Sequence, residues 1–145
     1  MAYAEGTTVP FERSRAEIEQ TLKRYGATSF AYEWKDKKAV ILFEASVRHL
    51  RFELAMPTAS EFEGTRYASS EEKCAAEMRR RWRCLALVIK AKLEAVQSGI
   101  AEFEEEFLAH IILPNGETAG EWMKPQIAMA YETGKMSPLL TGGAR

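Results

Sequence analysis

The sequence predicts an α+β fold in one domain, residues 1–145: an N-terminal helix, a three-stranded antiparallel meander, then a long helix or helical hairpin and a C-terminal helix. Three observations predict it. Apolar side chains recur at spacings of three and four near the start and through the second half of the chain, as in amphipathic helices. Between these stretches they alternate with polar side chains, as in half-buried strands. Capping patterns of Ser or Thr followed by Glu stand before the helical stretches.

The first helix is expected over about residues 15–25. Ser14 and Glu17 match a capping box, in which the serine oxygen accepts from a free amide of the first turn and the glutamate reaches back. Gly26 can supply the left-handed residue that ends such a helix. Residues 1–8 come before it and are expected to be flexible. One face carries apolar side chains at helical spacing: Ile18, Leu22 and Tyr25.

Three strands follow, over 30–34, 39–44 and 48–56. The first alternates with period two and places its aromatic side chains on one face: Phe30, Tyr32 and Trp34. Short connections between the strands favour an antiparallel meander. The pattern leaves open which face of this sheet the helices cover. Residues 58–70, rich in Ser, Thr, Glu and Gly, are expected to form a mobile loop.

A second capping box, Ser69 with Glu72, opens the long helix. Its apolar stripe is long: Cys74, Met78, Trp82, Leu85, Ile89, Leu93 and Val96. Residues 84–89 are apolar nearly all the way round, and Leu87 falls on the side away from the stripe. A helix that is apolar on both sides is usually packed on both sides, so a second subunit is expected there.

Gly99 leaves two alternatives for the segment that follows. If the helix ends at Ser98, residues 100–110 form a separate helix with four core-facing residues: Ile100, Phe103, Phe107 and Ile111. If Gly99 lies inside the helix, at a cost of about 1 kcal/mol, one helix of about 40 residues would run about 60 Å and need a partner chain. The break is the favoured alternative.

The last helix is predicted from a third capping box, Thr118 with Glu121. Pro125 is expected to kink or restart it. Its expected packing contacts are Trp122, Ile127, Ala130 and Tyr131. Residues 136–145 show no periodicity and are expected to be loose.

Composition excludes several classes of protein. Hydrophobic residues make up 46% and charged residues 28%, as in ordinary globular proteins. No apolar run approaches the length of a membrane span, and the first residues lack the pattern of a signal peptide, so a cytoplasmic protein without a membrane contact is expected. The two cysteines, Cys74 and Cys84, are too far apart on one helix for a disulfide and are expected to be core thiols.

Charge is sorted along the long helical region. Six basic residues and no acid lie between Arg79 and Lys92. A sheet that binds single-stranded nucleic acid uses aromatic side chains to stack on bases and basic side chains to neutralise phosphates, and the aromatic strand and these basic residues provide both. The same aromatics would also line the buried face of any small sheet, and arginines on the outer side of a helix are usually solvated. The candidate nucleic-acid-binding residues are Arg48, Arg51, Arg79, Arg80, Arg83 and Lys90.

An acidic stretch follows the basic one. Between Glu94 and Glu106 there are five acids and no base. Basic and acidic halves of this kind permit antiparallel pairing of two copies, so a homo-oligomer, most simply a two-fold dimer, is expected. The candidate interface residues are Leu87, Glu102 and Glu105.

No enzymatic activity, cofactor or metal site is predicted. Glu106 and His110 lie four apart, a spacing at which a carboxylate can orient an imidazole. A metal site needs three or more ligands, however, and His49 is the only other histidine. No phosphate-binding glycine loop or dinucleotide fingerprint is present.

Three stretches resemble a group of small, mostly uncharacterised proteins encoded by bacteriophages and prophages. They are Val9–Ile18 (VPFERSRAEI); Arg81–Arg83 (RWR) with Val88–Val96 (VIKAKLEAV); and Phe103–His110 (FEEEFLAH) with Leu113–Gly116 (LPNG) and Gly120–Met123 (GEWM). The resemblance implies a setting in the cytoplasm of a host cell and assigns no functional residue. Within that setting two functions are expected as alternatives. One is a non-enzymatic accessory protein that binds nucleic acid, single-stranded DNA in particular, in replication or recombination. The other is an anti-defence interaction protein that inhibits a host factor or sequesters a nucleotide signal.

Overall fold

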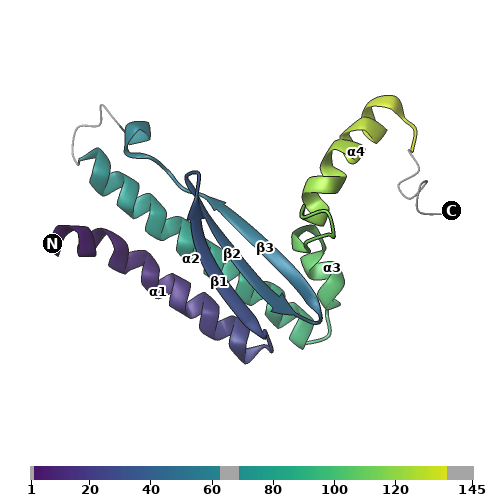
Figure 1. Cartoon of the computed structure of the whole chain (residues 1–145), viewed down its shortest axis with the longest axis horizontal. Helices are drawn as coiled ribbons and strands as arrows, with labels where there is room; N and C mark the ends of the chain where they lie inside the picture. The colour runs from purple at the N-terminus through teal and green to yellow at the C-terminus, as the bar shows by residue number, and fades with distance from the viewer. Residues whose placement is uncertain (1, 63–68, 137–145) are drawn as a thin grey trace.

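The computed structural model describes residues 2–62 and 69–136, with side chains from Phe11 onward. The elements are α1 (Ala2–Arg24), β1 (Ser29–Lys35), β2 (Lys38–Ala45), β3 (Arg48–Ala55), η1 (Ala59–Phe62), α2 (Ser70–Gln97), α3 (Phe103–Phe107), η2 (Leu108–His110) and α4 (Ala119–Thr133). This order confirms the α+β fold with a helix, a meander, a long helix and a C-terminal helix (Figure 1). Residues 63–68 of the expected loop and 137–145 of the expected loose tail lie outside the described residues.

The sheet is an antiparallel meander in the order β1-β2-β3. Two-residue turns join the strands, and both residues of each turn have positive φ, at Asp36 and Lys37 and again at Ser46 and Val47. Turns of this kind match the right-handed twist of the strands that they connect. The branched side chain of Val47 is 84% exposed in a backbone conformation that such residues rarely adopt.

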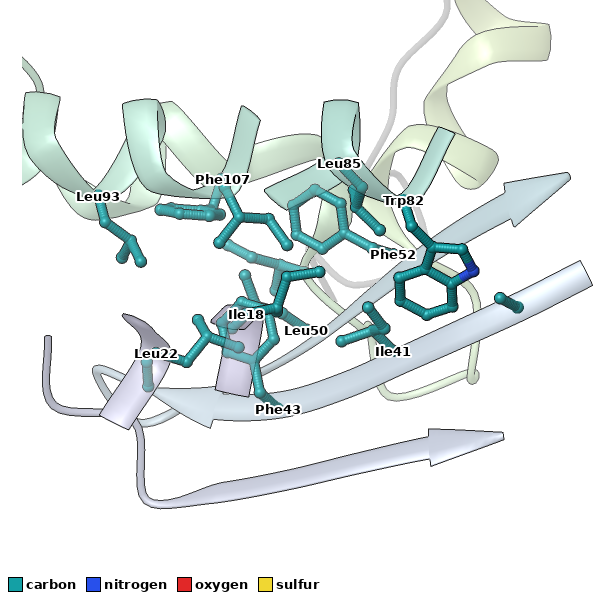
Figure 2. Close-up of a cluster of buried hydrophobic side chains, with 14 of the residues drawn as sticks. Ile18, Leu22, Ile41, Phe43, Leu50, Phe52, Trp82, Leu85, Leu93 and Phe107 are labelled. Atoms are coloured by element: carbon teal, nitrogen blue, oxygen red, sulfur yellow. The ribbon is translucent and has the colours of Figure 1, made fainter. Parts of the chain in front are cut away.

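Helices α1 and α2 cover one face of the sheet and run parallel to each other (Figure 1). Phe11 of α1 stacks on Trp82 of α2 with ring centroids 5.5 Å apart. Further along both segments, the hydroxyl of Tyr25 donates to Glu94 at 2.5 Å. Because both partners of this second contact come later in the chain than those of the first, the two helices run in the same direction. Figure 2 shows the core between these layers, with Trp82 and Leu85 pointing from α2 towards the sheet. The fully buried large side chains are Trp82, Phe43, Phe107, Ile18, Leu22, Ile41, Leu50 and Ile89.

The first helix begins at Ala2, so its predicted start after Ser14 was wrong. Ser14 is 5% exposed and lies inside the helix, on the side that packs against the rest of the fold. A buried small polar residue followed three positions later by an exposed glutamate has the same sequence pattern as a capping box. Residues 2–8, expected to be flexible, belong to this helix. The boxes at Ser69 and Thr118 are confirmed.

The break at Gly99 is confirmed. This residue has φ +83°, and α2 ends just before it at Gln97. The following helix is shorter than predicted, because Ile100 and the next two residues are outside it and α3 begins at Phe103. Ile100 is 83% exposed, so its predicted core contact was wrong, whereas Phe107 is buried.

Helix α4 projects away from the sheet (Figure 1). It continues through Pro125 and buries no residue, so the contacts predicted for Ile127 and Tyr131, which are 46% and 87% exposed, were wrong. The helix is joined to the body at its first turn. A Cβ on Gly120 would lie 3.0 Å from the carbonyl oxygen of Ala109, so glycine permits this close approach.

Candidate nucleic-acid interface

The covered face of the sheet is the one with the aromatic side chains. Phe30 and Tyr32 are half-buried against the core, and the ring of Tyr32 lies 5.6 Å from that of Trp82. Only Trp34, at 48% exposure, remains largely open. The uncovered face carries mainly charged side chains: Glu33, Glu44, His49, Arg51 and Glu53. The hypothesis of a base-stacking sheet is therefore wrong, because the aromatic platform faces the helices.

Two strand arginines are occupied by carboxylates of the same chain. Arg48 lies 2.6 Å from Glu104 of α3. Arg51 lies 2.7 Å from Glu121 of α4, and it also donates to the carbonyl oxygen of Gly116. Both arginines hold the C-terminal elements against β3. This geometry does not favour their predicted role as phosphate ligands.

Helix α2 carries another predicted site residue, Arg80, next to Arg81. Arg80 and Arg81 both bind Glu77, at 2.7 and 2.8 Å. Hydrogen bonds from Arg80, and then from Arg81, lower the pKa of Glu77 to about 2. Arg81 also donates to the carbonyl oxygen of Ala55 at 2.7 Å. One carboxylate thus holds both guanidinium groups, so the three side chains together keep a single positive charge.

Three other cations of α2 form what we call the basic row: Arg79, Arg83 and Lys90. Steps of four and seven residues place them within about 40° of one another around the helix and over about 16 Å of its length. None of them has a hydrogen-bond or ion-pair partner among the side chains that the structure describes. Arg83 and Lys90 are exposed and Arg79 is half-buried. The row is the largest group of uncompensated cations among the predicted site residues.

The predicted oligomer residues are all exposed. Leu87 is 67% and its neighbour Val88 45% exposed on α2. Glu102 caps the start of α3 without a side-chain hydrogen bond, and Glu105 lies in its first turn. Cys84, expected in the core, is exposed as well. These positions are open to a partner, and the structure contains a single chain.

The pairing of Glu106 with His110 is wrong. Glu106 binds Lys92 at 3.2 Å, while the ring of His110 stacks on Phe52 at 3.8 Å. Burial lowers the pKa of His110, and Lys92 lowers it further. Among the described residues, no three His, Cys, Asp or Glu side chains lie together in an arrangement that could hold a metal ion.

His110 lines a cavity of about 270 Å³ that the sequence did not predict. The cavity lies where β3, η2 and the first turn of α4 meet, and its lining includes Arg51, Glu121 and Lys124. Residues 70 positions apart meet there, as the Arg51–Glu121 pair shows. No local pattern could have indicated it.

None of the helices in the described ranges is both long and apolar enough to cross a membrane. No known family model, no curated protein and no solved structure matches the chain.

Proposed function

We propose that this protein binds single-stranded nucleic acid without catalysing a reaction, as an accessory in replication or recombination, and that the basic row of α2 is its binding surface. The observation that supports the proposal is the alignment of Arg79, Arg83 and Lys90, none of which forms an ion pair or hydrogen bond with a described carboxylate. Cations in this arrangement attract phosphates, which is the main source of sequence-independent binding.

The helix keeps these cations in place. On its opposite side Trp82, Leu85 and Ile89 are buried in the core, so α2 cannot rotate away from a ligand. Successive charges lie about 6 and 10 Å apart along the axis. Long, flexible side chains at such distances can reach separate phosphates of one extended strand. The net charge of the chain is only -1, so attraction has to come from this local row.

The number of cations determines the expected salt dependence. Neutralising three phosphates of a single strand gives a slope of about -2 in a plot of log affinity against log salt concentration. We therefore expect modest affinity at about 50 mM salt and a loss of about tenfold or more by about 200 mM.

The test is fluorescence anisotropy with a labelled oligothymidylate at several salt concentrations. The variant Arg79→Gln/Arg83→Gln/Lys90→Gln should abolish the salt-dependent binding. A matched control, Lys38→Gln/Arg48→Gln/Arg80→Gln, removes as many cations, but each of these is paired with a carboxylate. The control should retain most of the affinity. Wild-type binding weaker than about 10⁻⁴ M at low salt, or an equal loss in the control, would contradict the proposal.

The second candidate function is an interaction protein that inhibits a host factor or sequesters a nucleotide signal. The exposed apolar side chains of α4 favour it, since Ile127, Met129 and Tyr131 are 46%, 53% and 87% exposed. Mass spectrometry of molecules released on denaturation separates the two. An oligonucleotide that co-purifies supports the first function, and a small nucleotide supports the second.

Self-association belongs to the same proposal, but the predicted surface competes with the basic row. Leu87 lies one turn after Arg83 and three residues before Lys90, so a subunit docked on Leu87 would cover the cations. We therefore expect the homo-oligomer to form through a different surface.

A further inference from the structure

The two edges of the sheet differ in how their backbone groups are used. At the β3 edge, the amide of Ile112 donates to the carbonyl oxygen of His49 at 2.8 Å. The guanidinium of Arg81 donates to the carbonyl oxygen of Ala55 at 2.7 Å. His49 and Ala55, near the two ends of this edge, are thus bonded by the chain itself.

The β1 edge has no such cover. The two-residue turn at Asp36 and Lys37 makes Lys35 and Lys38 a pair that exchanges both backbone hydrogen bonds. Alternation along the strand then points the N–H and C=O groups of the even-numbered residues outward: Phe30, Tyr32 and Trp34. No described group bonds any of these six outward groups.

Strand β1 has the regular geometry that a further strand needs in order to pair with it. Its seven residues run from Ser29 to Lys35 without a bulge or proline, in continuous register with β2. Open edges that proteins protect usually carry prolines, bulges or several charges. Trp34, at 48% exposure, stands beside the open backbone. An added strand would cover this ring as well as the free amides.

We propose that β1 pairs with β1 of a second copy, antiparallel about a two-fold axis at Tyr32. In this register Phe30 faces the partner's Trp34, Tyr32 faces the partner's Tyr32, and Trp34 faces the partner's Phe30. All outward groups of both strands are then paired, in about six backbone hydrogen bonds. Aromatic residues directly opposite each other add cross-strand stabilisation. We propose a second copy of the chain as the partner, because two β1 strands in this register match each other's outward backbone groups and aromatic side chains.

The pairing has a consequence for the helices. A two-fold axis perpendicular to the sheet keeps both helical layers on the same side of a continuous six-stranded sheet. The two basic rows then lie on one side of the dimer and can engage one nucleic-acid strand together, which raises the effective affinity. The dimer itself does not depend on the nucleic-acid proposal. No opposite charges face each other across the strands, so added salt should not weaken it.

Sedimentation equilibrium of the full chain tests the dimer in the absence of nucleic acid. The wild type should be a dimer at tens of micromolar. Trp34→Pro removes an outward N–H and leaves the ladder to β2 intact, because proline is tolerated on an edge strand. It should weaken dimerisation at least about 100-fold, the effect of losing bonds worth about 3 kcal/mol. Trp34→Lys, which keeps the amide and adds an edge charge, should weaken it as well.

Leu87→Glu is the matched control, since it places a charge on the alternative surface of α2. It should leave the dimer unchanged. A wild type that is monomeric at about 100 µM, a Leu87→Glu variant that becomes monomeric, or folded Trp34 variants that dimerise like the wild type would each overturn the proposal. Thermal unfolding followed by circular dichroism shows which variants are folded. A dimer that binds no oligonucleotide would refute only the proposed function.

Discussion

Helices α2 and α4 start in the same way and end up in opposite surroundings. Each begins with a complete capping box, in which Glu72 donates its amide to Ser69 at 3.0 Å and Glu121 donates its amide to Thr118 at 3.2 Å. Both carry many apolar side chains. Yet α2 buries four residues, Trp82, Leu85, Ile89 and Leu93, whereas α4 buries none.

The difference lies in where the apolar side chains point. In α2 most of them fall on one stripe, so a single face can be covered, while Leu87 and Val88 outside the stripe stay exposed. In α4 they are spread round the axis, since Trp122 and Ile127 lie about 140° apart. No single contact could cover them all. Local signals thus determine that a helix forms, while the coherence of its apolar face determines whether the fold covers it.

The largest expected effect is at the centre of the α2 stripe. Trp82→Ala should destabilise the protein by about 3–5 kcal/mol, because a fully buried large side chain is lost. Tyr131→Ala on α4 should change stability by less than about 0.5 kcal/mol. Urea unfolding followed by circular dichroism compares the two. A Tyr131 variant as unstable as the Trp82 variant would show that α4 is covered after all.

The caps should differ in the extent of the structure that they stabilise. Ser69→Ala and Thr118→Ala should each cost about 1 kcal/mol of helix stability. Because α2 is part of the core, the first change should lower global stability. The second should increase hydrogen exchange in α4 alone, since this helix is joined to the body only at its first turn. If Thr118→Ala lowers the protection of the sheet equally, α4 and the core unfold as one unit.

The smallest effect concerns pH at the base of α4. Burial lowers the pKa of His110 below its ordinary value, with help from Lys92. The stability contributed by the neutral ring is complete above about pH 6.5 and is lost as the pH falls through the lowered folded pKa. Exchange in α4 should therefore rise between about pH 7 and pH 5 relative to that in α2. His110→Gln should remove this dependence, and an unchanged profile would contradict it.

The sequence predicted what depends on neighbours along the chain. Alternation located the three strands, the stripe on α2 located the core face, and Gly99 located the break. It did not predict what depends on distant partners. Arg48 and Arg51 read as free cations because Glu104 and Glu121, which bind them, are 56 and 70 positions away.

Two further errors have a local origin. Ser14 satisfies the letters of a capping box while lying buried inside α1. Trp34 shares its strand face with two half-buried aromatics, but it sits at the end of an edge strand and stays half exposed. Periodicity gives the direction of a side chain. It does not give the extent of the layer that covers it.

The parallel arrangement of α1 and α2 sets an order for folding during synthesis. Phe11 and Tyr25 reach their partners Trp82 and Glu94 only after about 70 more residues have been made. At 5–20 residues per second this takes about 4–14 s. The meander is synthesised earlier, so Ile18 and Leu22 can pack against the sheet before α2 is made. The side of α1 that packs against α2 stays uncovered until α2 has been synthesised. A nascent chain therefore exposes one apolar helix face for seconds, a window in which a chaperone or a second nascent chain could bind it.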